Sequence, residues 1–183
     1  MNDALKPYFD ALASRPTLYT ARLLLRMPQE IDIPALIEIV GDWEVASRLA
    51  RIPYPYTEEH ARYFLAEVVP AEMAWSIIDR ATETMVGVVG LAPYAQEAGT
   101  LELGYYLGRQ HWGSGIATEA SAVVAAYGAG LIGQRLVKAG YFADNPGSGR
   151  VLEKLGFVRV GTFERHCLTT NEIKPSVEMA YRC

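Results

Sequence analysis

Hydrophobic residues recur three or four positions apart, the spacing of one helical face, in four stretches of the chain. Asp32 and Thr57 are good N-caps at the start of two of these stretches, and Gly41 and Gly156 follow the last hydrophobic positions of the first and the fourth. The pattern therefore predicts helices over residues 32–41, from 57, from 115 and over 146–155.

Runs rich in β-branched, aliphatic and aromatic residues predict strands around and between these helices. They cover residues 18–26, 74–80, 85–92, 100–107, 135–142, 158–167 and 177–182. In the strand over 100–107, alternation places Leu101, Leu103, Tyr105 and Leu107 on one face and Glu102, Gly104 and Tyr106 on the other. This order of elements predicts a mixed α/β domain rather than a regular doubly wound sheet.

The chain is expected to hold one domain, because its 183 residues contain no internal repeat, low-complexity tract or long linker. Residues 1–17 are interpreted as an N-terminal extension and 18–183 as the domain. Residues 43–56 are expected to form a short helix and a loop rich in proline and tyrosine, RIPYPY. That loop is either a wall of a substrate site or a structural connection.

The composition is that of an ordinary globular protein, and it argues against several functions. No apolar run reaches the roughly 18–20 residues that cross a bilayer, and the N-terminus does not resemble a signal peptide, so we expect a cytoplasmic protein without membrane contact. A net charge of −4 without a Lys/Arg run argues against nucleic-acid binding. Cys167 and Cys183 are too few for a disulfide framework, and no His/Cys cluster predicts a metal site.

The segment over residues 110–120, QHWGSGIATEA, carries the most functional information. It follows a predicted strand and opens a predicted helix. Gly113 and Gly115 allow the main chain to approach a ligand closely, and the first helical turn offers unpaired N–H groups at the positive end of the helix dipole. Such a site suits a pyrophosphate without needing a lysine. A plain glycine-rich turn before a helix would give the same pattern.

This segment resembles the signature of the GNAT acetyltransferase superfamily, Gln/Arg-x-x-Gly-x-Gly/Ala, which Gln110, Gly113 and Gly115 fill. The flanking sequence is similar to the branch that includes the ribosomal-protein N-terminal alanine acetyltransferases. The matching pieces, in the expected order within residues 18–182, are TARLLLR, ELGYYL, GIATEA, Asn145-x-x-Ser148 and RVLEKLGF.

The resemblance implies an N-acetyltransferase that uses acetyl-CoA as co-substrate and needs no metal. Its fold would be a central, mostly antiparallel sheet of roughly six to seven strands flanked by about four helices. A homodimer is plausible from the resemblance. The acceptor would be a primary amine, either a protein N-terminus or a small-molecule amine, attacking directly in a ternary complex.

The resemblance also implies where acetyl-CoA would bind. The main chain of Tyr105 and Leu107 would pair with the pantetheine arm, and the side chain of Asn145 would contact the same arm. Main-chain amides of the loop and helix start would hold the pyrophosphate, contributed by Gln110, His111, Gly113, Ser114, Gly115, Ile116 and Ala117.

The same resemblance places Ser148 near the thioester sulfur, where its hydroxyl would bind the leaving thiolate. Its spacing from residues 151, 152 and 155 puts it on the apolar face of the predicted helix, and a buried hydroxyl needs a partner. The alternative is an N-terminal cap, the commonest role of a serine near a helix start.

Glu102 is the first candidate for the base that takes the amine proton, because its strand should border the acetyl group. The alternative is a solvated strand residue. Glu164, His166 and Cys167 lie on the next-to-last predicted strand, where relatives often place acidic or polar catalytic groups. Cys167 stands where some relatives have a glutamate, and an aspartate that relatives carry near Pro175 is missing. Catalysis by positioning alone, without a dedicated base, is therefore also open.

Two other functions compete with this one. Glycines at 128, 130 and 133 match a dinucleotide fingerprint, but they follow a helical alanine run and precede a predicted strand, so we interpret them as a helix end. A non-catalytic acyl-CoA sensor or partner-binding module would keep the cofactor loop without turnover, and the missing acidic residues allow it. Neither a nucleophile elbow nor a Walker A lysine is present.

Overall fold

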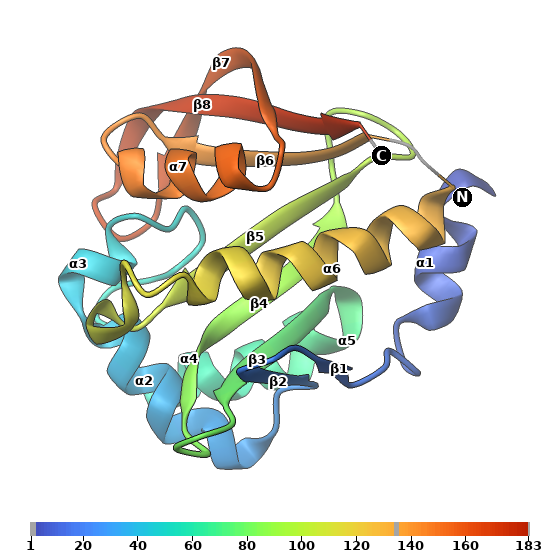
Figure 1. Ribbon diagram of the computed structural model, residues 1–183. Coiled ribbons are helices and arrows are strands. Elements are labelled where there is room, and N and C mark those ends of the chain that lie inside the picture. The colour runs from blue at the N-terminus through green and yellow to red at the C-terminus, as the bar shows by residue number, and fades with distance from the viewer. Residues whose placement is uncertain (1–2, 134–135, 183) are drawn as a thin grey trace.

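The computed structural model describes residues 3–133 and 136–182. The strands of these residues form one eight-stranded sheet in the order β1-β2-β3-β4-β5-β6-β8-β7 (Figure 1). The strands are β1 (Leu18–Tyr19), β2 (Leu23–Arg26), β3 (Met73–Asp79), β4 (Met85–Pro93), β5 (Leu101–Leu107), β6 (Leu136–Phe142), β7 (Val158–Cys167) and β8 (Glu172–Arg182). Neighbouring strands are antiparallel except for the pair β5 and β6, which is parallel. The predicted mixed, mostly antiparallel fold is confirmed, with more strands than expected.

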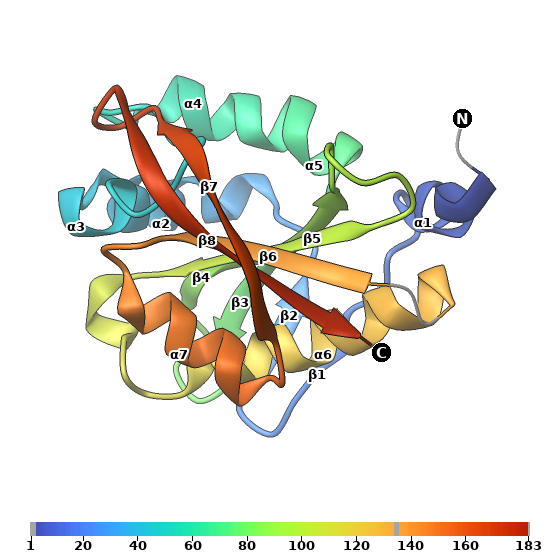
Figure 2. The ribbon, with the colours of Figure 1, turned by 90° about the horizontal axis from the view of Figure 1, so that it is seen from above.

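Helices cover both faces of the sheet (Figure 2). They are α1 (Lys6–Ala11), α2 (Ile33–Gly41), α3 (Trp43–Ala46), α4 (Glu58–Tyr63), α5 (Val69–Ala71), α6 (Ile116–Ile132) and α7 (Pro146–Lys154). Short 3₁₀ turns lie at Asp3–Leu5, Glu30–Asp32 and Arg109–His111, and a π-helical segment, Phe64–Val68, joins α4 to α5. Helices α2 to α5 cover one face, and α1, α6 and α7 cover the other.

Alternation along β5 divides its side chains between two hydrophobic cores, as the sequence predicts. Leu101, Leu103 and Leu107 are buried against α6 in the first core, which also contains Trp75. Tyr106 packs against the second core, beneath α2 to α5. The sheet is therefore buried on both faces around β5, and this strand is held firmly from above and below.

Strands β5 and β6 pair over only a short length and then separate. Their register joins Leu101 to Val137 and Glu102 to Lys138, and no later residue of either strand. Because the Gly108 N–H donates to the Val86 carbonyl at 3.0 Å, antiparallel alternation directs the peptide groups of the even-numbered residues toward β4. The peptide groups of residues 105 and 107 consequently face the gap left by β6.

The expected single strand over 18–26 is wrong, because the chain turns back on itself. Leu18 pairs with Leu25 in a short hairpin. The turn is held by the Thr20 N–H, which donates to the Leu23 carbonyl at 3.0 Å, and by the Thr20 hydroxyl, which accepts from the Leu23 N–H at 2.9 Å. Hydrophobic residues flank this turn on both sides, so the run reads as continuous while the chain reverses within it.

Other boundaries differ less from expectation. The last strand begins at Glu172, earlier than the expected Val177, because it pairs along the whole of β7. Gly128 lies inside α6 and Gly133 ends the helix with φ +64°, which confirms the helix-end interpretation of the three glycines. Arg135, the expected start of the strand that corresponds to β6, lies outside the described residues, as does Cys183.

The N-terminal residues pack onto the sheet. Tyr8 is fully buried, and its hydroxyl donates to the Leu91 carbonyl at 2.9 Å and accepts from the Met73 N–H at 3.1 Å. Met73 and Leu91 are partners in the β3–β4 ladder, so the phenol completes the end of that ladder. The division into an extension over 1–17 and a domain over 18–183 stays a prediction.

Replacing Tyr8 with Phe should lower the free energy of unfolding by about 1–3 kcal/mol, because the Met73 N–H and the Leu91 carbonyl lose a buried partner. Tyr19→Phe is the matched control, since that ring is 67% exposed, and it should change stability by less than about 0.5 kcal/mol. Urea unfolding followed by circular dichroism measures both. Equal midpoints for the two variants would contradict the proposed anchoring.

Candidate active site

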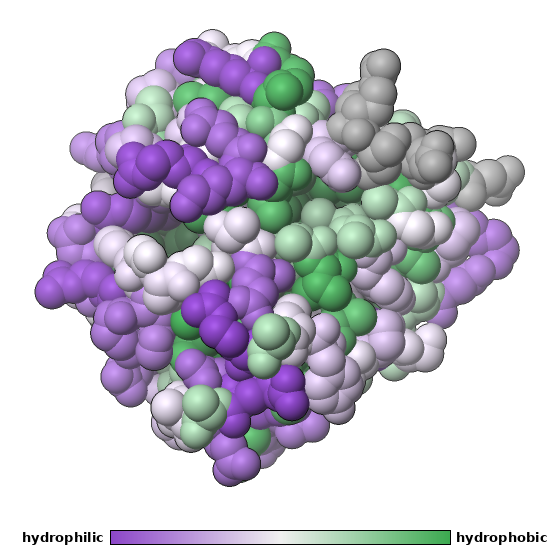
Figure 3. All heavy atoms as spheres, in the orientation of Figure 1, coloured by the Kyte–Doolittle hydropathy of each residue, from purple (hydrophilic) through white to green (hydrophobic). Residues whose placement is uncertain are grey.

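A cleft of about 1340 Å³ opens where β5 and β6 separate. Its walls come from the loop after β5, from β5 and β6, from the start of α7 and from the segment over 48–56. The hollow between α7 and the start of α6 is visible on the face shown in Figure 3, with hydrophobic surface at depth and polar residues around it. The sequence stretch over 110–117, Asn145, Ser148 and Glu102 thus lie at or beside one cleft.

The loop after β5 requires its glycines. Gly113 and Gly115 have φ of +74° and +82°, a left-handed conformation that side chains rarely adopt. Gly115 is the N-cap of α6 and supplies no capping side chain, so the first-turn N–H groups remain open to a ligand. The Ser114 hydroxyl donates to the His111 carbonyl at 2.6 Å and tightens the loop. The loop over residues 108–115, the anion loop, thus has the geometry of an anion site at a helix N-terminus.

Arg22 braces this loop from outside the cleft. Its Nη1 donates to the Ser114 carbonyl at 3.1 Å, and its Nε donates to Glu119 Oε2 at 2.7 Å. Glu119 also accepts from the Thr20 hydroxyl. Burial acts to raise the pKa of Glu119, but the hydrogen bonds from Thr20 and Arg22 outweigh it and lower the pKa. The sequence pattern gives no sign of this brace, because Arg22 and Glu119 are far apart in the chain.

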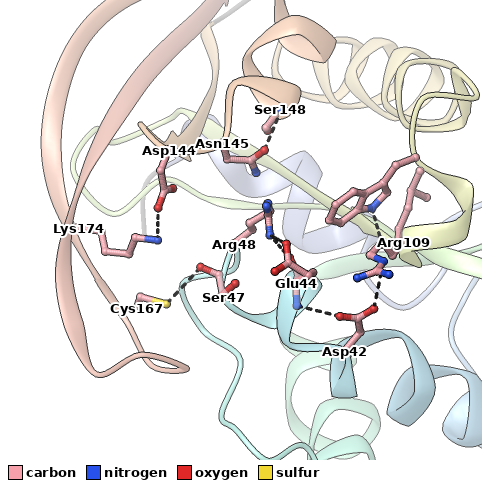
Figure 4. A network of polar contacts seen from close by, with 12 residues as sticks. Asp42, Glu44, Ser47, Arg48, Arg109, Asp144, Asn145, Ser148, Cys167 and Lys174 are labelled. Atoms are coloured by element: carbon pink, nitrogen blue, oxygen red, sulfur yellow. Dashed lines mark hydrogen bonds and ion pairs between the residues drawn. The ribbon is translucent and has the colours of Figure 1, made fainter.

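At the start of α7, Asn145 is the N-cap and Ser148 is not. The Asn145 Oδ1 accepts from the Ser148 N–H at 3.3 Å. Figure 4 shows both side chains at the start of α7, with Arg48 below them. The Ser148 hydroxyl is thereby released from capping and lies 2.8 Å from the hydroxyl of Tyr105. The capping alternative for Ser148 is wrong, although its catalytic role is a separate question.

The gap-facing edge of β5 is partly occupied. The Leu107 carbonyl accepts from the indole Nε1 of Trp112 at 3.0 Å, so this carbonyl already has a donor. The guanidinium of Arg48 lies over the Trp112 ring, 5.2 Å from its centre. The peptide groups of Tyr105 are the part of this edge that best matches the expected pairing with a pantetheine arm.

Glu102 is engaged in an ion pair. Arg165 Nη2 lies 2.6 Å from Glu102 Oε1, and both side chains line the cleft. A second pair, Arg51 with Glu72, lines the same region through hydrogen bonds of 2.6 and 2.8 Å. Glu72 and both arginines were not predicted, because they come from three distant segments of the sequence.

Of the other candidates, His166 lines the cleft, with its Nε2 3.1 Å from Asn171 Oδ1, whereas Glu164 and Cys167 do not line it. Glu164 is exposed. Cys167 is buried, and its thiol lies 3.5 Å from the Leu49 carbonyl and 3.8 Å from that of Ser47, so it fastens the β7–β8 hairpin to the segment after α3 (Figure 4). Among the described residues, no group of three or more His, Cys, Asp or Glu side chains is arranged for a metal ion.

The phenol side chains of Tyr56 and Tyr106 line the cleft. Burial raises the pKa of Tyr56 to about 12 and also raises the pKa of Tyr106, to which Tyr56 contributes. Neither hydroxyl has a hydrogen bond to another side chain or peptide group within the described ranges. Gly104 lies on the same face of β5, and a Cβ at this position would meet no atom within 4 Å. The cleft therefore has room and free polar groups on this face of β5.

Residues 22–158 match the family described as the acetyltransferase (GNAT) domain, which is well over half of the chain. The chain belongs to the GNAT acetyltransferase family. An uncharacterized N-acetyltransferase of Bacillus licheniformis is 31% identical over 150 residues, covering 79% of this chain and 84% of that protein. The GNAT chain is accordingly an N-acetyltransferase, an enzyme that transfers acetyl groups to amines.

Solved structures agree with this assignment. A GNAT-family acetyltransferase from Bacillus anthracis has a TM-score of 0.79 at 26% identity, over 91% of this chain and 98% of that one. The ribosomal-protein-S5-alanine acetyltransferase of Vibrio fischeri has a TM-score of 0.76 at 16% identity, over 91% and 96%. The spermidine N-acetyltransferase of Vibrio cholerae, solved with CoA and spermine, has a TM-score of 0.74 at 18% identity, over 89% and 96%. The last two share the fold.

No helix within the described part of the GNAT chain is long and apolar enough to cross a membrane.

Arg22→Met should raise the KM for acetyl-CoA about fivefold with little change in kcat, because an exposed ion pair and one loop hydrogen bond hold the anion loop in place. Arg80→Met is the matched control, since Arg80 donates to the Thr20 and Ala21 carbonyls of the same turn and does not touch the loop. Initial rates at varied acetyl-CoA measure both. Equal effects of the two substitutions would contradict the brace.

Proposed function

We propose that the GNAT chain transfers the acetyl group of acetyl-CoA to a primary amine by direct attack in a ternary complex, without a covalent acyl-enzyme. The observation that carries the proposal is the cleft that runs from the anion loop, along the separated edge of β5, to Tyr56 and Tyr106. One end suits a diphosphate, the middle offers unpaired peptide groups, and the far end has space for a second substrate. Such an arrangement holds two reactants together, which itself contributes much to rate.

The residues that would hold acetyl-CoA are those of the loop and the strand edge. The amides around Gly113, Gly115 and the first turn of α6 would bind the pyrophosphate. The Tyr105 peptide groups would pair with the pantetheine arm. The Asn145 Oδ1 already caps α7, and its amide nitrogen would contact that arm.

Amine attack on the thioester needs a polarised carbonyl, a stabilised leaving thiolate and a neutral amine. A peptide N–H on the free edge of β5 would polarise the carbonyl. The Ser148 hydroxyl would donate to the thiolate, since Asn145 has taken over the capping. The proton lost by the amine balances the proton that the thiol finally carries.

Glu102 would take the amine proton through a water molecule. Its ion pair with Arg165 holds one carboxylate oxygen at 2.6 Å and leaves the second oxygen available. Glu72, which is paired with Arg51, is the other carboxylate of the cleft within the described chain. Replacing Glu102 and Glu72 with glutamine, one at a time, would distinguish the two carboxylates. The variant that lacks the essential base should be slower than wild type at high pH as well as at low pH.

The acceptor remains to be identified by experiment, and a protein N-terminal α-amine or a small-molecule amine would both fit. The decisive measurement is release of the CoA thiol from acetyl-CoA in the presence of peptides with different N-termini, polyamines and other small amines. Acyl transfer to at least one class supports the proposal. Saturable acetyl-CoA binding without thiol release across the whole panel would favour the alternative, an acyl-CoA sensor.

Gly115→Glu should abolish CoA binding, because a carboxylate at the helix start repels the diphosphate and fills the loop. Gly133→Glu is the matched control: it also places Glu at a positive φ, +64°, where a Cβ meets nothing, and it does not line the cleft. Isothermal titration calorimetry with CoA should show no binding for the first variant and wild-type affinity for the second. Unchanged affinity in Gly115→Glu would overturn the assignment of the loop.

Ser148→Ala should lower kcat about 10- to 100-fold and change the KM for acetyl-CoA less than about twofold, because the lost hydrogen bond acts on developing charge. Ser121→Ala is the control, since the buried Ser121 hydroxyl has no partner among the described residues and lies away from the cleft. Steady-state kinetics with the best acceptor of the panel measure both. A wild-type kcat in Ser148→Ala would remove Ser148 from the mechanism.

A further inference from the structure

The hydroxyl of Tyr105 contacts Ser148 in two ways. It lies 2.8 Å from Ser148 Oγ and donates to the Ser148 carbonyl at 3.0 Å in the arrangement described. Tyr105 comes from β5 and Ser148 from α7, so this pair joins the two sides of the cleft where β6 no longer pairs with β5. The main chain of Tyr105 is part of the proposed CoA site, but its side chain has no role in that proposal.

The hydrogen count makes this contact informative. Each hydroxyl carries one hydrogen, and the Ser148 carbonyl can only accept. If Tyr105 donates to the carbonyl, the short contact between the hydroxyls requires Ser148 to donate to Tyr105. If Tyr105 donates instead to Ser148 Oγ, the hydrogen of Ser148 is free to point into the cleft. The pair therefore has two hydrogen-bond arrangements with the same heavy-atom positions.

We propose that Tyr105 is a positioning residue that turns the hydroxyl hydrogen of Ser148 toward the leaving thiolate. The inference rests on the proposed role of Ser148. As the C–N bond to the amine forms and the C–S bond breaks, the electron pair of that bond moves to sulfur. Ser148 then donates to the sulfur, and Tyr105 donates to Ser148 Oγ. Both hydroxyls keep their protons, and the thiolate takes up, through water, the proton that the amine releases.

The surroundings suit a donor that stays protonated and fixed. Burial raises the pKa of Tyr105 to about 12; the hydrogen bond to Ser148 acts in the opposite direction, and Tyr141 adds to the rise. Helix α7 packs tightly on β6, because a Cβ at Gly149 would come within 2.7 Å of the Tyr141 hydroxyl. Ser148 is thus held in position by the helix, and the remaining freedom of its hydroxyl is rotation.

Tyr105→Phe removes the donor while keeping the ring. We expect kcat to fall about tenfold with the KM for acetyl-CoA within about twofold of wild type, and the double variant Tyr105→Phe/Ser148→Ala to be no slower than Ser148→Ala alone. Tyr127→Phe is the control: that ring packs edge-on against Trp75, its hydroxyl has no hydrogen bond within the described ranges, and it lies outside the cleft.

A second measurement needs CoA alone. The thiolate absorbance of bound CoA, titrated with pH, should show a thiol pKa about one unit higher in Tyr105→Phe than in wild type or in Tyr127→Phe. A loss that is merely structural would not move this value selectively. Tyr105→Phe behaving like Tyr127→Phe in both measurements, or losses that multiply in the double variant, would overturn the inference. If wild type transfers acetyl to no amine, the proposed function fails, and the thiol titration still decides the role of Tyr105.

Discussion

The early separation of β5 from β6 is the constraint on which the site depends. A sheet normally satisfies its peptide groups through the neighbouring strand, and leaving them unpaired in a buried position is costly. Here the pairing ends after Glu102 and Lys138, although both strands continue. The exposed edge is tolerable because it borders a cleft that admits solvent or a ligand. The same edge gives an extended, amide-containing arm a partner without any specialised side chain.

The two sides of the gap are fixed by different means. On the β5 side, left-handed glycines turn the chain into α6, and Arg22 ties the loop to Glu119 and to the β1–β2 turn. On the β6 side, Asn145 starts α7 and leaves Ser148 free for the cleft. Loop, strand edge and helix start are therefore positioned by main-chain geometry, and few side chains need to be chemically special.

Sequence alone predicted most of the fold and the order of the site segments. The helical periodicity of α2 and α6 and the alternation in β5 come from burial on one face or both, which hydrophobic patterns report directly. The hydrophobic pattern did not predict the reversal between β1 and β2, because the Thr20 turn lies inside a continuous apolar run. The pairs Arg51–Glu72 and Arg165–Glu102 were not predicted either, since ion pairs between distant segments leave no local pattern. The capping of α7 became clear only from the position of Asn145 in the structure.

These ion pairs bear on how an amine can react in the cleft. An ammonium group has no lone pair and cannot attack, so a site that stabilised the cation strongly would hold the acceptor in its unreactive form. An unpaired carboxylate in a partly buried cleft would do that. In Arg51–Glu72 and Arg165–Glu102 each carboxylate already faces a guanidinium, which offsets its attraction for a cation. Such a cleft can orient the acceptor through the free hydroxyls of Tyr56 and Tyr106, and deprotonation of the amine still costs little free energy at neutral pH.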